Sequence, residues 1–203
     1  MDLSEVTVLV PTRNEAHNVG RFIASLHPAV PLIVVDSSTD ETPELIRRLR
    51  PERTTIIRER CNVVVARQLG AAHAQSEWLL FTDADVTFAP DYFSHLMSLD
   101  ATDARLGLIF GAKDTLDGRY NLYHRLFELG QRALSWVGVP AATGSNLLVR
   151  RSAFQHVGGF DLRLTCNEDS EIAWRVKRAG CRVRFAPMLR VYSHDHRRLR
   201  RGA

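Results

Sequence analysis

The chain has few cysteines: three in 203 residues, at Cys61, Cys166 and Cys181. Their number is odd, and no Cys-x-x-Cys or cysteine–histidine spacing surrounds them. Disulfide frameworks and structural zinc sites depend on such patterns, so the sequence argues against both. We therefore expect a reducing, cytoplasmic setting.

Long apolar runs are also absent. No run approaches the ~20 residues that a membrane-spanning helix needs. The first residues include Asp2 and Glu5 and show neither the basic nor the apolar region of a signal peptide. We expect a soluble protein, or at most one that is peripheral to a membrane.

Neither sign of charge is in large excess. The net charge is +4, and much of the positive balance lies in the run His194–Arg201. No aromatic stacking platform accompanies these basic residues, so nucleic acid is not an expected partner. The run is interpreted as a solvated tail, with contact to anionic lipid or a polyanion as the alternative.

The glycine-rich phosphate-binding motifs are missing too. Neither G-x-G-x-x-G nor a P-loop follows any predicted strand. This absence argues against a Rossmann dinucleotide site and against a Walker-type phosphate site.

Alternating strand and helix patterns are what the chain does contain, with no linker or repeat between them. Its strands are continuous apolar runs, which are typical of a mostly parallel sheet covered on both faces. We predict an α/β fold in a single domain over 1–203. The predicted strands are 6–10, 32–35, 54–57, 78–82, 108–111, 147–149 and 183–185, and the predicted helices are about 18–26, 42–49, 63–74, 121–136, 152–157 and 168–179.

Polar residues follow three of these strands directly: 11–15, Asp36 and 83–85. In parallel sheets, ligands bind outside the carboxyl ends of the strands. The three polar clusters therefore converge on one edge, where we expect the binding site.

Asp83 and Asp85 are separated by one residue just past a strand. Hard divalent cations such as Mg²⁺ or Mn²⁺ favour carboxylate oxygens and bridge to substrate phosphates. The alternative is a turn whose aspartate caps the next helix. The position of the pair on the binding edge favours the metal.

Two further residues point to a nucleotide. Asp36 can accept hydrogen bonds from ribose hydroxyls or a base N–H, or else cap the next helix. Arg67 lies on the helix before the metal strand, where it can pair with a diphosphate or remain solvated.

Glu168 and Asp169 begin a helix. They are either charges favoured by the helix dipole or a general base for an acceptor hydroxyl, and the residues alone do not separate the two. His194 follows the last strand and is either part of the tail or a metal ligand.

Taken in order, these motifs resemble the GT-A glycosyltransferases, and specifically glycosyltransferase family 2. The resemblance covers nearly the whole chain. Its motifs are VLVPTRNE at 8–15, VVDSSTDET at 34–42, ARQLG at 66–70, FTDAD at 81–85, GSN at 144–146 with the arginines at 150–151, GGFD at 158–161, and ED at 168–169 with Arg175 and Gly180.

The resemblance implies a fold of the nucleotide-diphospho-sugar transferase type, with a nucleotide-binding half at 1–100 and an acceptor-binding half at 101–203. It also assigns roles to the site residues. Pro11, Thr12, Glu15 and Asp36 would hold the base and ribose, Arg67 and Asp83 would bind nucleotide, Asp85 would be the main metal ligand with Asp83 and His194 nearby, and Asp169 would be the catalytic base with Glu168 beside it.

The implied reaction is metal-dependent, inverting transfer of one sugar from a UDP- or GDP-sugar to an acceptor hydroxyl, with a lipid-linked acceptor as one candidate. The Gln-x-x-Arg-Trp motif of processive synthases is absent, which favours single transfer. The second motif is one residue shorter than the usual Asp-Asp-Gly-Ser-Thr-Asp and lacks its glycine. The alternatives are a retaining GT-A transferase, a nucleotidyltransferase, or a catalytically silent nucleotide-sugar-binding module.

The segment 120–136 carries apolar residues near helical spacing, with Arg125, Glu128 and Arg132 between them. Such a stripe packs on the sheet or forms a homodimer contact. The alternative is an amphipathic helix in a membrane surface, helped by the basic tail. The stripe consists of Tyr120, Tyr123, Leu126, Phe127, Gly130, Leu134 and Val137.

Overall fold

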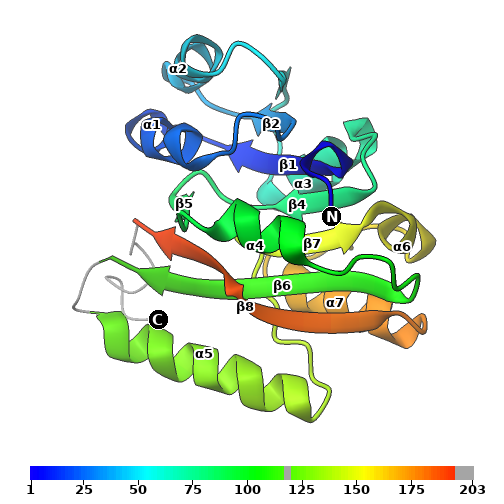
Figure 1. Ribbon diagram of the computed structural model, residues 1–203. Coiled ribbons are helices and arrows are strands. Elements are labelled where there is room, and N and C mark those ends of the chain that lie inside the picture. Colours follow the sequence, from blue (N-terminus) through cyan, green and yellow to red (C-terminus); the bar gives the residue numbers. More distant parts are fainter. Residues whose placement is uncertain (117–119, 195–203) are drawn as a thin grey trace.

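A computed structural model describes residues 1–116 and 120–194 (Figure 1). One eight-stranded sheet runs through these residues, in the order β3-β2-β1-β4-β7-β6-β8-β5. The strands are β1 (Val6–Thr12), β2 (Leu32–Asp36), β3 (Thr54–Arg58), β4 (Trp78–Phe81), β5 (Val86–Phe88), β6 (Leu106–Thr115), β7 (Leu147–Arg150) and β8 (Arg182–Ser193). The helices are η1 (Leu3–Glu5), α1 (Ala16–Ser25), α2 (Thr42–Leu49), α3 (Val63–His73), α4 (Tyr92–Ser98), α5 (Asn121–Trp136), α6 (Arg151–His156) and α7 (Glu168–Arg178).

The sheet is mostly parallel, as predicted. Strands β1 to β4 run in one direction, and β6 and β8 share it. Only β7 and β5 are reversed among the strands described. The carboxyl ends of β1, β2 and β4 therefore meet at one edge of the sheet.

Alternate residues of the central strands pack into two different apolar clusters. Val8 of β1 belongs to a cluster with residues of α1 and α4, and its neighbour Leu9 belongs to one with residues of α3 and α7. Figure 1 shows α4 in front of the sheet and α3 and α7 behind it. Because both faces are covered, the central strands carry apolar residues on both faces, and this is why their sequences lack a period of two.

The last strand is longer than predicted. The sequence predicts 183–185, but β8 extends to Ser193 and pairs with β5, a strand that the sequence does not predict. Its register against β6 shifts between Gly111 and Ala112. Pro187 lies within this irregular stretch and has no N–H to donate to a neighbouring strand.

The side chain of Asn146 binds both strands where their register shifts. Its Nδ2 donates to the carbonyl oxygens of Ala112 (3.0 Å) and Leu189 (2.8 Å), and its Oδ1 accepts from the hydroxyl of Tyr92 (2.8 Å). Asn146 is almost fully buried. Its bonds thus hold β6 and β8 at the point where their register changes.

Helix α5 has the predicted bounds but not the predicted orientation. Its sheet-facing side is polar, with His124 and Gln131 buried. Most of its large apolar side chains are exposed, including Leu126 at 59% and Val137 at 75%. The prediction that this stripe packs on the sheet is therefore wrong.

Two other sequence predictions concern what the fold contains. In the part of the chain that the structure describes, no cysteine forms a disulfide, and no helix is both long and apolar enough to cross a bilayer. Most of the basic run, including Arg197–Arg201, lies outside the described residues.

Candidate active site

A cleft of about 930 Å³ opens at the carboxyl-end edge of the parallel strands. It is lined by the ends of β1 and β4, the first residues of α7 and part of α5. Eight of the ten predicted site residues line it: Pro11, Thr12, Glu15, Arg67, Asp83, Asp85, Glu168 and Asp169.

The loop 83–85 turns both of its carboxylates toward the cleft. Ala84 between them is 3% exposed and packs into the core, while Asp83 and Asp85 line the cleft. At the other end of the loop, the backbone N–H of His194 donates to the carbonyl of Asp85 (2.9 Å). The Nε2 of His194 lies 2.9 Å from the hydroxyl of Thr87.

These residues suit a hard divalent cation. Asp83 and Asp85 offer oxygen donors on one wall of the cleft, and Mg²⁺ or Mn²⁺ is commonly held by one or two carboxylates together with substrate phosphates and water. Within residues 1–116 and 120–194, no three or more His, Cys, Asp or Glu side chains are grouped so that they could hold a metal ion together, so Asp83, Asp85 and His194 do not form a three-residue ligand set there.

Arg67 links the two carboxylate groups of the cleft. Its guanidinium is 5% exposed, and it donates to Asp83 through Nη2 (2.7 Å) and to Glu168 through Nη1. Burial acts to lower the pKa of Arg67, but Asp83 and Glu168 outweigh it, and the pKa is raised. Arg67 is thus a fixed cation between the loop 83–85 and helix α7.

Asp169 is held by backbone groups rather than by a cation. Its Oδ2 accepts from the N–H of Gly144 (2.6 Å) and its Oδ1 from the N–H of Ser170 (2.7 Å). Burial raises the pKa of Asp169, and the negative charge of Glu168 adds to this effect. The hydrogen bonds from Ser170 and Gly144 and the charge of Arg67 oppose the rise without cancelling it. A carboxylate in a cleft with a raised pKa is suited to take up a proton.

Residues 7–158 match the family described as Glycosyl transferase family 2, which is most of the chain. The chain belongs to glycosyltransferase family 2. The predicted family is therefore confirmed.

Relatives of this family 2 chain include a pre-mycofactocin glycosyltransferase from Mycobacterium tuberculosis, 29% identical over 95% of this chain and 43% of the relative. The succinoglycan biosynthesis protein ExoA from Rhizobium meliloti is 28% identical over 87% of this chain and 59% of the relative. A polyprenol monophosphomannose synthase from Mycolicibacterium smegmatis is 27% identical over 89% of this chain and 75% of the relative. The chain thus spans about half the length of the first two relatives.

Solved structures confirm the GT-A fold. The mannosyltransferase PcManGT from Pyrobaculum calidifontis, in complex with GDP-Man and Mn²⁺, superposes with a TM-score of 0.79. It is 25% identical, over 95% of this chain and 58% of that one. Staphylococcus aureus TarS in complex with UDP-GlcNAc shares the fold at 15% identity and a TM-score of 0.69.

In this family 2 chain, Asp36 does not line the cleft. Its carboxylate is 1% exposed and accepts from the hydroxyls of Thr12 (2.6 Å) and Ser38 (2.6 Å) and from Arg58 (2.8 Å). It therefore positions Thr12, which does line the cleft. Direct contact of Asp36 with a ribose stays a prediction, as do the nucleotide contacts of the residues that line the cleft.

Several cleft residues were not predicted. Tyr123, His124 and Phe127 reach it from α5, and Lys113 reaches it from β6. Lys113 had a signal in the sequence, because it is the first charged residue after the apolar run 106–112. Gly144 belongs to the GSN motif at 144–146, to which the sequence assigns no role. The structure shows that its N–H donates to Asp169.

Proposed function

We propose that this chain moves one sugar from a nucleotide sugar to an acceptor hydroxyl, with the help of Mg²⁺ or Mn²⁺ and with inversion at the anomeric carbon. The observation that carries the proposal is the cleft itself. It brings the paired carboxylates Asp83 and Asp85 together with Asp169, a half-buried carboxylate whose pKa is raised.

The donor would occupy the part of the cleft that is lined by the first half of the chain. Pro11, Thr12 and Glu15 would contact the base and ribose, with Asp36 holding Thr12 in place. The relatives support a UDP- or GDP-sugar, because the mannosyltransferase structure contains GDP-Man and one TarS structure contains UDP-GlcNAc.

Asp85 would hold the metal ion, with Asp83 and His194 beside it. When bound, such an ion neutralises charge that develops on the departing diphosphate. Asp83 already shares its negative charge with Arg67. Arg67 would serve the nucleotide site by fixing Asp83.

Asp169 would act as the base. It takes the proton of the acceptor hydroxyl while that oxygen forms a bond to the anomeric carbon, and the bond from this carbon to the diphosphate oxygen breaks. Attack from the face opposite the diphosphate inverts the configuration. Glu168 is paired with Arg67, so Asp169 is the better placed of the two carboxylates.

The acceptor would enter from the half formed by residues 101–203. Tyr123 and Phe127 of α5 give this side of the cleft an aromatic lining. One relative is named as a polyprenol monophosphomannose synthase, which supports a lipid-linked acceptor. A cytoplasmic enzyme with peripheral membrane contact would meet such an acceptor at the bilayer surface.

A screen of nucleotide sugars tests the proposal. We expect one UDP- or GDP-sugar to raise the melting temperature in the presence of Mn²⁺, and slow hydrolysis of that donor to release the nucleoside diphosphate. Asp169→Asn should keep donor binding and lose ~10²-fold or more in turnover. Asp91→Asn, which removes a carboxylate that is 65% exposed on the surface, is the matched control.

Three results would contradict the proposal. Normal turnover by Asp169→Asn would leave the carboxylate as a structural group. Retained anomeric configuration in the product, determined by nuclear magnetic resonance, would indicate a retaining transferase. Donor binding with no hydrolysis and no transfer to any acceptor would indicate a silent binding module.

A further inference from the structure

Helix α5 is amphipathic in the reverse of the usual sense. A surface helix normally buries its apolar stripe and exposes its polar one. Here His124, Glu128, Gln131 and Ser135 recur at helical spacing on the inner side, where His124 and Gln131 are buried and Glu128 pairs with Arg190 of β8. The opposite side, which we call the outward face, is apolar. It consists of Leu122 (70% exposed), Leu126 (59%), Leu129 (60%), Trp136 (92%) and Val137 (75%).

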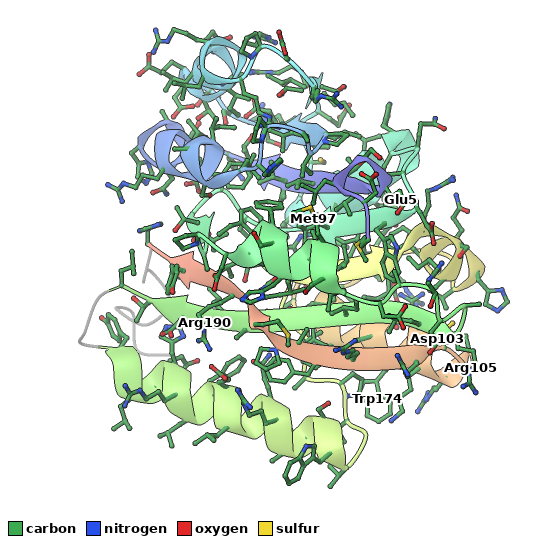
Figure 2. The ribbon with its side chains drawn as sticks, viewed as in Figure 1. Glu5, Met97, Asp103, Arg105, Trp174 and Arg190 are labelled. Atoms are coloured by element: carbon green, nitrogen blue, oxygen red, sulfur yellow. The ribbon has the colours of Figure 1, made fainter. Side chains whose placement is uncertain are left out.

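The inner polar residues have partners that fix this orientation. Glu128 accepts from Arg190 of β8 (2.9 Å) and from Arg132 (2.7 Å), and Gln131 donates to the carbonyl of Ala141 (2.8 Å). Burial acts to raise the pKa of Glu128, but the hydrogen bonds from Arg132 and Arg190 outweigh it and lower the pKa. Figure 2 shows Arg190 beside the first half of α5. Turning the helix over would break these contacts.

The outward face thus exposes a row of large apolar side chains on one helix. Contiguous apolar patches on a soluble surface mark interaction sites. We propose that the outward face of α5 docks on an anionic membrane surface, with the helix lying in the plane of the interface.

Charge favours lipid over a second copy of the chain. The one acidic residue of α5 is Glu128, which is turned inward and paired. Arg125 is exposed on the flank of the outward face, and the neighbouring end of α7 carries Arg178. A face that is apolar and positive matches a bilayer with anionic headgroups. Two copies meeting through it would instead bring like charges together.

The far end of α5 has features that suit the headgroup region. Trp136 is 92% exposed, and Trp174 of α7 is 38% exposed with Arg178 over its ring (5.9 Å). Lys177 of α7 donates to the carbonyl of Gly138, which joins the two helix ends. Figure 2 shows Trp174 close to the second half of α5. Tryptophan is enriched at the level of lipid headgroups.

The docking face is continuous with the cleft. Tyr123 and Phe127 stack on each other (ring centroids 6.2 Å apart), and both line the cleft. They occupy the flank of α5 between the outward face and the site. A chain docked through α5 would therefore hold its cleft at the bilayer surface, where an amphiphilic acceptor resides.

Vesicle flotation tests the inference, with vesicles of phosphatidylcholine alone or mixed with phosphatidylglycerol. We expect the full chain to float with the mixed vesicles. Leu126→Gln combined with Leu129→Gln should lower the partition coefficient for the mixed vesicles by at least about tenfold, because burying one leucine alone is worth about that factor in affinity. Leu49→Gln combined with Met97→Gln is the matched control, since these residues are 48% and 45% exposed on α2 and α4. Figure 1 places α2 at the opposite end of the molecule from α5.

Unchanged melting temperatures would show that both double variants remain folded. Flotation of the Leu126/Leu129 variant at the wild-type level would overturn the inference, because basic charge alone would then explain adsorption. So would a wild-type dimer in light scattering that the same variant converts to a monomer, without vesicle binding by either. Lipid binding is measured without any sugar transfer, so failure of the proposed reaction would leave this test intact.

Discussion

Gly144→Ala is the change that most directly tests how the cleft is held together. The new Cβ would lie 2.6 Å and 2.8 Å from the two terminal nitrogens of Arg67 and 2.9 Å from its Cζ. Ordinary contacts between such atoms are about 3.5–4.0 Å, so the guanidinium has to move by about 1 Å. A shift of that size breaks the 2.7 Å hydrogen bond to Asp83 or the pair with Glu168.

Two estimates bracket the loss of stability. Removing one partner of a buried ion pair costs about 3–5 kcal/mol. Overpacking a well-packed site costs about 1–3 kcal/mol. The lower range applies, because Arg67 keeps both partners and can relax toward one of them. For a domain of this size we expect the melting temperature to fall by roughly 2–12 °C.

The effect on turnover should be larger than the effect on stability. The N–H of Gly144 donates to Asp169, so a displaced loop also displaces the proposed base. A misplacement of about 1 Å can cost ~10²-fold in rate. We expect nucleoside diphosphate release, measured below both melting temperatures, to fall by about that factor.

Gly20→Ala is the control. Gly20 lies in α1 with no atom within 4 Å of a built Cβ, and alanine in a helix interior is favoured over glycine by ~1 kcal/mol. This variant should melt at or above the wild-type temperature with unchanged turnover. Identical behaviour of Gly144→Ala would refute the role given to the contact between Gly144 and Arg67.

Three further predictions address the metal, the base and Asp36. Asp85→Ala should abolish Mn²⁺-dependent binding of nucleoside diphosphate, measured by calorimetry, while the protein remains folded. An unchanged affinity for nucleoside diphosphate with Mn²⁺ would contradict the metal assignment. Because the pKa of Asp169 is raised and its charged form is the proposed base, kcat/KM should fall with decreasing pH through a midpoint above the ordinary 3.8. The same raised pKa means that ionised Asp169 costs stability, so the melting temperature of Asp169→Asn relative to wild type should rise as pH increases through that midpoint. Asp36→Asn should lower the free energy of unfolding in urea by about 1–3 kcal/mol. Most of this loss should come from the buried hydrogen bonds of Asp36, because its ion-pair partner Arg58 is 50% exposed. An unfolding free energy equal to that of Asp91→Asn would contradict this prediction.

The sequence predicts most of the sheet because the physics of its strands is local. Runs such as 32–35 are apolar at every position, and only a strand covered on both faces needs that. The polar residues after these runs then lie at the binding edge without further information. This is why Asp83 and Asp85 were placed correctly on the cleft, although their ligand stays a prediction.

The remaining features depend on contacts between distant residues. The sequence predicts that Arg67 contacts the nucleotide. It gives no sign that Arg67 pairs with Glu168, because the two residues are 101 positions apart in the chain. The pattern of α5 identifies a helix, but the same periodicity describes an apolar stripe that faces the sheet or one that faces away. Arg190 and Ala141 decide the orientation by binding Glu128 and Gln131. The sequence predicts β8 only as far as residue 185, because Pro187 interrupts the apolar pattern of the strand.

Strand β8 is synthesised long after the loop that it contacts. The loop that carries Asp83 and Asp85 is held by the end of β8. The backbone N–H of His194, the residue after this strand, donates to the carbonyl of Asp85. Thr87 and His194, which also contact each other, are 107 residues apart. At ~5–20 residues per second, the ribosome would take roughly 5–20 s to make this stretch. During that time residues 1–87 have already been made, but the strand whose end holds the loop 83–85 has not. A stalled chain lacking β8 should therefore fail to bind nucleotide with Mn²⁺, even though β1 to β4 are already present.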